Sequence, residues 1–152
     1  MNIIIRDFAV ENIFLITSLI KEVFFEHIAP LYPRQGVDEF FVYIDPRHTL
    51  NRQRGSHAIL EAVDEDTKSI IGMIETRNKN HVCLFFVKSA YQRKGVGRLL
   101  LQEAIKRVPL QSSITVNASP NAVDAYEALG FYATGELKEE SGMRFVPMRY
   151  ER

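Results

Sequence analysis

The most informative stretch of the chain runs over residues 84–101 and reads LFFVKSAYQRKGVGRLLL. It starts as an apolar strand, passes through a polar turn with Gly95 and Gly97, and continues with the spacing of an amphipathic helix. The backbone N–H groups at a helix start have no intrahelical partner, and the peptide dipoles there favour an anion. The stretch therefore predicts an anion site that a phosphate approaches closely over the glycines. Positive charge at the same turn comes from Arg93, Lys94 and Arg98.

Two familiar phosphate-binding motifs do not fit this turn. A dinucleotide-binding fingerprint needs a third glycine, but Leu100 stands three residues after Gly97. A nucleotide-triphosphate P-loop needs Gly-Lys followed by Ser or Thr, and the chain has no such tripeptide. A plain structural interpretation stays open, in which the glycines only form a turn and the cations only solvate it.

A second segment, residues 114–131, reads ITVNASPNAVDAYEALGF. It predicts a strand over 114–118 and a helix that begins at Pro120, with Ser119 as N-cap and Gly130 just past its end. Helical spacing turns Tyr126 inward beside small residues, which leaves space around the phenol. The alternative is that this tyrosine simply anchors the core.

The remaining pattern predicts an α/β fold with a mixed, mostly antiparallel central sheet flanked by helices. A strand is expected over residues 2–8 and a helix over 10–27, followed by a helix from 37 to the mid-forties and a charged loop around Arg52 and Arg54. An antiparallel meander is expected at 57–64, 69–76 and 81–87, a helix at 95–107, and closing strands at 131–138 and 143–150. Without repeats or linkers, residues 1–152 are expected to form a single domain.

Taken together, the two segments resemble the GNAT superfamily of N-acetyltransferases. The family's acetyl-CoA motif is Gln/Arg-x-x-Gly-x-Gly/Ala after a strand that ends in Val, and here residues 92–97 follow Val87. The family's downstream motif is Ala-x-x-x-Tyr-x-x-x-Gly-Phe, and it matches Ala122, Tyr126, Gly130 and Phe131. The strand and helix order of the remainder also fits, so the resemblance covers nearly the whole chain.

The resemblance implies that acetyl-CoA is the co-substrate, with its pantetheine arm beside strand 81–87 and its pyrophosphate on the amides of residues 93–98. It also implies that Tyr126 is the general acid that protonates the departing CoA thiolate, because a phenol with a pKa of about 10 is protonated at pH 7. The implied cofactor-binding residues are Phe85, Phe86, Val87, Gln92, Arg93, Lys94, Gly95, Val96, Gly97 and Arg98.

Three departures from the family pattern leave parts of the site open. Many relatives have Asn where this chain has Ser119, and it stays undecided whether Ser119, Asn117 or Asn121 contacts the cofactor. Ser89 replaces a proline that is common just after the strand. The strand at 114–118 carries no glutamate, so the motif assigns no general base.

The expected reaction is direct transfer of the acetyl group to a primary amine in a ternary complex. The amine must lose a proton, to a carboxylate or to a chain of water molecules, and Glu75 is the candidate base. The alternative is a solvated strand glutamate. Cys83 is interpreted as a small core residue, while His81 on the same strand face keeps an acyl-enzyme route open.

The amino-acid composition limits the classes of partner that are expected for this chain. Nineteen basic residues balance nineteen acidic ones, which argues against nucleic acid and anionic membranes as partners. A single cysteine excludes an intrachain disulfide and a multi-cysteine zinc site, and no metal ligand set is predicted. The N-terminal residues do not resemble a signal peptide, and the most apolar stretch is too short to span a membrane. A cytoplasmic location is expected.

The acceptor is expected to be a small-molecule or peptide amine. The segment between the first strand and the meander is expected to shape the acceptor pocket. The alternative is that the aromatic residues of this segment only pack against the core. The residues in question are Tyr32, Arg34, Phe40, Phe41, Tyr43, Asp45 and His48, and the carboxylates Asp38, Glu39 and Asp45 suit a cation. A non-catalytic acyl-CoA-binding or regulatory module is the alternative function, and a homodimer is compatible with the fold.

Overall fold

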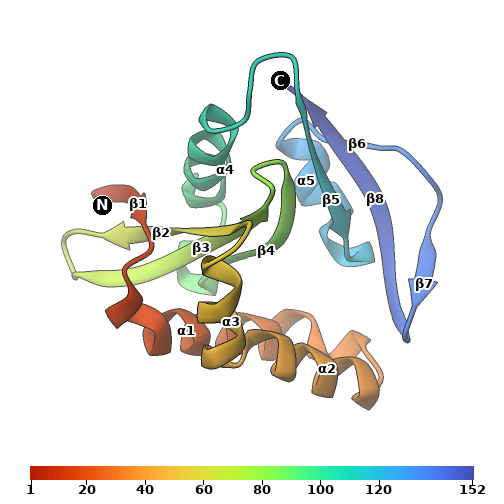
Figure 1. The fold of residues 1–152 in the computed structure, drawn as a ribbon, viewed down its shortest axis with the longest axis horizontal. Helices are drawn as coiled ribbons and strands as arrows, with labels where there is room; N and C mark the ends of the chain where they lie inside the picture. The colour runs from red at the N-terminus through yellow and green to blue at the C-terminus, as the bar shows by residue number, and fades with distance from the viewer.

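A mixed eight-stranded sheet crosses the middle of the molecule in the computed structural model, which describes residues 1–152 (Figure 1). The strands are hydrogen-bonded in the order β1-β2-β3-β4-β5-β8-β6, and β7 pairs with β8. All pairs are antiparallel except β4 with β5. The strands are β1 (Ile3–Asp7), β2 (His57–Asp64), β3 (Ser69–Arg77), β4 (His81–Val87), β5 (Ser113–Ala118), β6 (Tyr132–Ala133), β7 (Lys138–Glu140) and β8 (Met143–Glu151).

Helices cover both faces of the sheet and create two apolar cores. On one face, α4 packs its buried side chains, such as Leu100 and Ala104, against Ile71 and Ile74 of the sheet. On the other face, α1 packs residues such as Ile20 against Met73. The α-helices are α1 (Ile13–His27), α2 (Arg34–Ile44), α3 (Pro46–Gln53), α4 (Val96–Lys106) and α5 (Val123–Ala128). None of them combines the length and apolarity that crossing a membrane requires.

The centre of the sheet contains a bulge followed by a split. Glu75 of β3 lies opposite Leu84, but the next residue, Thr76, lies opposite Val82, so Cys83 has no partner on β3. On its other side β4 pairs with β5 only at two positions, His81↔Thr115 and Val82↔Val116. Beyond these pairs the two strands diverge (Figure 1). One edge of β4 is therefore unpaired over residues 83–87.

The region after α1 differs from the sequence expectation. Helix α2 begins at Arg34 rather than at residue 37, and the expected charged loop is instead α3. Asp45 caps α3 by accepting a 2.9 Å hydrogen bond from the backbone N–H of Arg47, and Pro46 occupies the first helical position. Arg52 is consequently held on a helix.

Two further expectations were wrong in detail. Residues 120–122 form a short 3₁₀ helix before α5, and Ser119 makes no capping hydrogen bond to the backbone. The strand expected over 131–138 is only two residues long. The backbone N–H of Thr134 still donates to the oxygen of Pro147 on β8 at 2.9 Å. Pro147 has no N–H to return a bond, and the regular pairing of β6 with β8 ends at Ala133↔Met148.

Candidate active site

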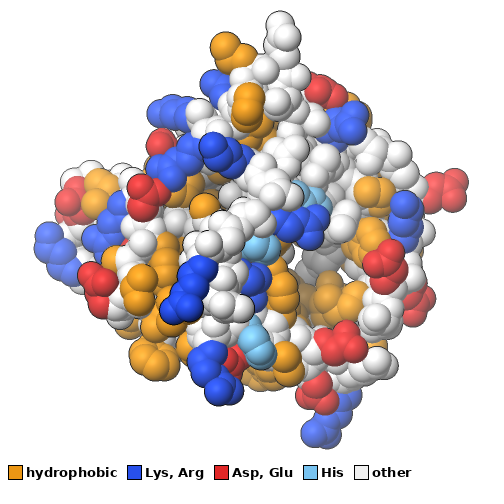
Figure 2. All heavy atoms as spheres, viewed as in Figure 1, with side chains coloured by type: hydrophobic (Ala, Val, Ile, Leu, Met, Phe, Trp, Pro, Cys, Tyr) orange, Lys and Arg blue, Asp and Glu red, His pale blue; other side chains and the backbone are white.

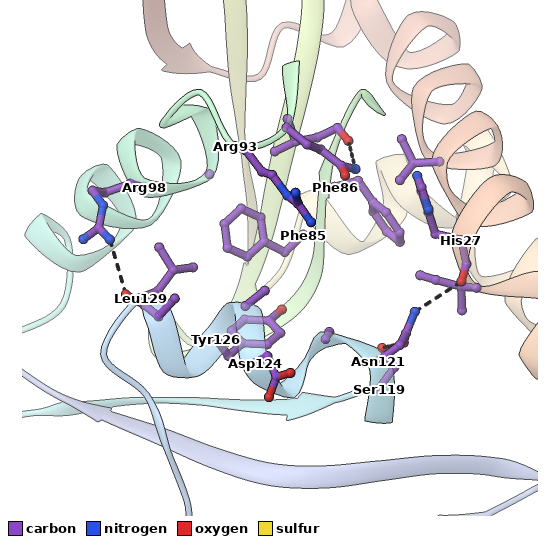
Figure 3. Close-up of a pocket in the computed structure, with 18 of the residues that line it drawn as sticks. His27, Phe85, Phe86, Arg93, Arg98, Ser119, Asn121, Asp124, Tyr126 and Leu129 are labelled. Carbon is purple, nitrogen blue, oxygen red and sulfur yellow. Dashed lines mark hydrogen bonds between the residues drawn. The ribbon is translucent and has the colours of Figure 1, made fainter. Parts of the chain in front are cut away.

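A cavity of about 870 Å³ lies where β4 and β5 diverge, between the end of α1, the start of α4, and α5 (Figure 3). It brings together the two segments that the sequence singled out. The predicted residues that line it are Phe85, Phe86, Val87, Gln92, Arg93, Gly95, Gly97, Arg98, Ser119, Asn121 and Tyr126. The other predicted residues do not line it and are described below.

The turn before α4 presents a row of free amides. None of the backbone N–H groups of residues 93–98 donates to another backbone group; the first that does is Leu99, to the oxygen of Gly95 at 3.0 Å. Arg93 and Gly95 both have positive φ, of 61° and 87°. The protein itself does not require glycine at position 97, since an added Cβ would make only ordinary contact with Phe85 at 3.5 Å. The missing side chain lets a ligand approach the backbone closely at this position.

The open edge of β4 offers a second set of hydrogen-bonding groups. Residues Phe85 to Val87 are paired with β3 on one side only, so half of their backbone groups face the split. The side chain of Gln92 donates to the oxygen of Val87 at 2.9 Å and holds the end of the strand. An extended ligand with amide groups fits along this edge in the way an additional strand does.

The three cations at the turn have different surroundings. The side chain of Arg93 points into the cavity (Figure 3). Arg98 donates to the oxygen of Ala128 at 3.3 Å and thereby connects α4 to α5. Lys94 does not line the cavity, and its ammonium lies 6.0 Å from the centre of the Tyr91 ring. Arg93 is therefore the best-placed cation for a phosphate.

Tyr126 projects from α5 into the cavity (Figure 3). Its ring meets Phe85 and Phe131 edge to face, with centroids 6.0 and 5.3 Å away. Burial raises the pKa of Tyr126 above its ordinary value of 10.0. The phenol is thus a neutral proton donor at pH 7.

Residues 28–152 match the family described as the acetyltransferase (GNAT) domain. The chain belongs to the GNAT acetyltransferases. The uncharacterized N-acetyltransferase YitH of Bacillus subtilis is 26% identical to this GNAT chain over 122 residues. That match covers 80% of the chain but 43% of YitH, so the chain spans less than half the length of this curated relative.

Solved structures share the GNAT fold over the full length of the chain. The PaiA N-acetyltransferase of Thermoplasma acidophilum, in complex with coenzyme A, has a TM-score of 0.81 at 18% identity, with 100% of both chains covered. A chimera of Vibrio cholerae spermidine N-acetyltransferase SpeG and hSSAT has a TM-score of 0.64 at 17% identity, covering 99% and 96% of the two chains. At these identities the likeness establishes the α/β GNAT fold that the sequence predicted.

Of the three polar residues from the end of β5 to the start of α5 of this GNAT domain, two line the cavity and one does not. Ser119 and Asn121 line the cavity, and the Ser119 hydroxyl donates to Asn121 Oδ1 at 2.8 Å. Asn121 in turn donates to the backbone oxygen of His27 at 3.2 Å. Asn117 is exposed on β5 and does not line the cavity, because strand alternation turns it away from its buried neighbours Val116 and Ala118.

Sequence reasoning missed the contribution of α1 to the GNAT cavity. Val23, His27 and Ile28 line the wall opposite α5. His27 Nε2 lies 2.8 Å from the hydroxyl of Ser89, which replaces the common proline, and that hydroxyl donates to Glu26 at 2.5 Å. These partners lie far apart in the sequence, and no local motif marks them.

Val96 does not line the cavity, because its side chain is buried in the core on the α4 face of the sheet. Its backbone N–H, the group that the resemblance assigns to the pyrophosphate, donates to no other backbone group. The described chain has no group of three or more His, Cys, Asp or Glu side chains arranged to hold a metal ion.

The expectation that Glu75 reaches the acceptor directly or through water is corrected by the structure. Glu75 is fully buried and does not line the cavity. Arg52 donates to both of its oxygens, at 2.8 and 3.1 Å, and His57 Nδ1 lies 2.7 Å from Oε2. The carboxylate is already paired on both oxygens, so it is a structural ion pair in this GNAT domain and not a solvated glutamate either.

The acyl-enzyme alternative at Cys83 finds no support in the surroundings of the thiol. Cys83 is half-buried and is not part of the cavity lining. Burial raises the pKa of the Cys83 thiol, which disfavours the nucleophilic thiolate. The thiol interacts weakly with the oxygen of His81 at 3.9 Å, and His81 Nδ1 lies 2.8 Å from the hydroxyl of Thr115 instead of activating the sulfur.

Proposed function

We propose that this protein transfers an acetyl group from acetyl-CoA to a primary amine by direct attack in a ternary complex. The observation that carries the proposal is that one cavity brings together four residues of the turn with free amides, the open edge of β4 and the phenol of Tyr126. The four residues are Arg93, Gly95, Gly97 and Arg98. An anion cradle, an edge for amide groups and a proton donor are the three features that acetyl transfer from CoA requires.

The residues present fit the co-substrate. The amides of residues 93–98 and the guanidinium of Arg93 suit the pyrophosphate. The backbone of Phe85 to Val87 suits the two amides of the pantetheine arm. Ser119 and Asn121 are the cavity-lining polar residues on the opposite wall, and we favour them over Asn117 as further contacts.

When bound, acetyl-CoA supplies a thioester whose acetyl carbon forms a C–N bond with the amine while the C–S bond breaks. Tyr126 donates its proton to the leaving sulfur, and its raised pKa keeps that proton on the phenol at neutral pH. A protonated acceptor first loses one proton to become a nucleophilic amine, and the attacking nitrogen loses a second proton as the amide forms. Because Arg52 and His57 occupy Glu75, we assign both protons to water. Tyr126 then recovers its proton from solvent.

A cationic small-molecule amine is the acceptor class we favour. Carboxylates lie along the β7 side of a surface hollow (Figure 2), and this part of the chain carries the exposed residues Glu136, Glu139 and Glu140. One protein of the same fold is named for spermidine. The single cysteine favours a reducing compartment, the cytoplasm, as the location.

The alternative function is an acyl-CoA-binding or regulatory module without turnover. Incubation with acetyl-CoA and a panel of spermidine, free lysine and a lysine-containing peptide, with detection of released thiol, separates the two. Thiol release that depends on an added amine supports the transferase. Calorimetric binding of CoA with no amine-dependent thiol release favours the module and contradicts the proposal.

A further inference from the structure

We propose that Tyr43 binds the acceptor amine through its hydroxyl, on the face of β4 opposite Tyr126. This inference rests on the proposed transferase function and names a residue for its second substrate. The open edge of β4, which suits the pantetheine arm, ends at the bulge of this strand.

The bulge lies at the expected position of the thioester. The anion cradle adjoins the Val87 end of β4, and the four residue steps from Val87 to Cys83 cover about 13 Å of open edge. Pairing with β5 resumes at Val82, so an extended ligand on this edge reaches no further than Cys83. The reactive end of the arm therefore meets the bulge.

Two phenols approach this position from opposite faces of the sheet. Phe85 and Tyr126 pack against the core on the α4 face. Cys83 and Tyr43 pack against the core on the α1 face, because the bulge keeps Cys83 on the side of Leu84. Burial, and then the neighbouring Cys83 and Glu75, raise the pKa of Tyr43, so its phenol is neutral and able to accept an N–H hydrogen bond.

An unusual set of contacts holds Tyr43 in place. The guanidinium of Arg52 lies 3.8 Å from the centre of the Tyr43 ring and also donates to the Tyr43 backbone oxygen. The same guanidinium is paired with both oxygens of Glu75. The ion pair fixes the phenol, and Glu75 offsets the positive charge of Arg52 that would otherwise repel a cationic amine.

The molecular surface leaves room for an acceptor on this side. Figure 2 shows a hollow above α2, at the place where β4 and β5 separate in Figure 1. The large cavity with the anion cradle adjoins the same split from the side of α4 and α5. Tyr43 of α2 is half-buried and packs against the core on the α1 face. We therefore place the amine of the acceptor on this side of the bulge.

The test compares Tyr43→Phe with Tyr132→Phe, a matched control that removes a hydroxyl bonded to Glu151 on the outer strand β6. In Tyr43→Phe we expect kcat/KM for spermidine to fall about tenfold, mainly through KM, for the loss of one hydrogen bond. The Kd for CoA and the Tm are expected to match the wild type. The control is expected to leave kcat/KM unchanged.

Alkylation of Cys83, the only cysteine, gives a readout without turnover. If the thioester end reaches the bulge, saturating acetyl-CoA, which has no free thiol to consume the reagent, slows the reaction of Cys83 with iodoacetamide several-fold. Absence of protection overturns the proposal, and so does a kcat/KM for spermidine in Tyr43→Phe within twofold of the wild type. If acetyl-CoA protects Cys83 but the wild type acetylates no amine, the transferase function fails, and the role of Tyr43 fails with it.

Discussion

The ring of Tyr126 lies 6.0 Å from the ring of Phe85, centroid to centroid, at an interplanar angle of 61°. This contact joins α5 to β4 across the cavity and fixes the direction of the phenol relative to the open strand edge. One aromatic pair therefore positions both the proposed proton donor and the strand edge proposed for the pantetheine arm. The geometry of such a pair contributes about 1 kcal/mol beyond its buried area.

Replacing Tyr126 with Phe removes the proton donor and keeps the aromatic contact. We expect kcat to fall about 100-fold, the lower end of the usual contribution of general acid catalysis. The Kd for CoA, measured by calorimetry, is expected to stay within twofold of the wild type. Full turnover by this variant would show that the thiolate leaves without the phenol.

The pH profile of kcat follows from the raised pKa of Tyr126. A proton donor loses activity when it ionises, so a pKa raised above 10.0 moves the alkaline decline of kcat to higher pH. We expect kcat to stay level between about pH 8 and 10. A decline with an apparent pKa of 10.0 or below, absent in Tyr126→Phe, would contradict the effect of burial on this phenol.

Charge reversal distinguishes the cations of the turn. Arg93 points into the cavity, whereas Lys94 lies outside it near Tyr91. We expect Arg93→Glu to weaken CoA binding at least about tenfold, as the loss of a charge-assisted hydrogen bond predicts. Lys94→Glu is the matched control, with an effect below about threefold that disappears at high salt. Equal losses in both variants would indicate a general field rather than a contact.

Alanine substitutions at Gly95 and Gly97 distinguish an effect on stability from an effect on CoA binding. Gly97→Ala lies inside α4 and meets only ordinary contacts, so we expect the free energy of unfolding to stay level or rise by up to about 1 kcal/mol. Gly95→Ala places a Cβ at φ 87° in open space and is expected to cost about 1 kcal/mol. Urea unfolding measures both. We also expect Gly97→Ala to bind CoA more weakly than the wild type. Weaker binding with unchanged stability would show that CoA contacts this turn.

Glu75→Gln tests the structural ion pair. Removing the charge of the fully buried Glu75 leaves Arg52, whose side chain is only 14% exposed, without a charged partner, and we expect a loss of about 3 kcal/mol in the free energy of unfolding. Asp38→Asn, in the exposed pair with Arg34 at 3.8 Å, is the control and is expected to cost less than about 0.5 kcal/mol. At temperatures where Glu75→Gln is still folded, we expect the decline of its kcat at acid pH to match that of the wild type. A shifted decline would restore Glu75 as the base.

Local patterns were sufficient for much of the site. The apolar run of β4, the glycine turn and the helical stripe of α4 each depend on near neighbours, and they place the free amides at residues 93–98. The same holds for Tyr126, whose inward direction follows from helical spacing. Arg52 was predicted to lie in a loop, but the structure places it on α3. The helix begins at the Asp45 cap, which is a local signal that the sequence interpretation overlooked.

The sequence by itself determined the fold class, the order of most elements and the turn with free amides at residues 93–98. Hydrophobic period, helix capping and glycine placement each depend on residues close together in the chain. Only the tertiary structure decided which polar groups meet. It buried Glu75 between Arg52 and His57, and it brought His27 of α1 to Asn121 and Ser89 across the cavity. These contacts form where the bulge and the split direct the strands, and neither feature follows from the local pattern of one strand.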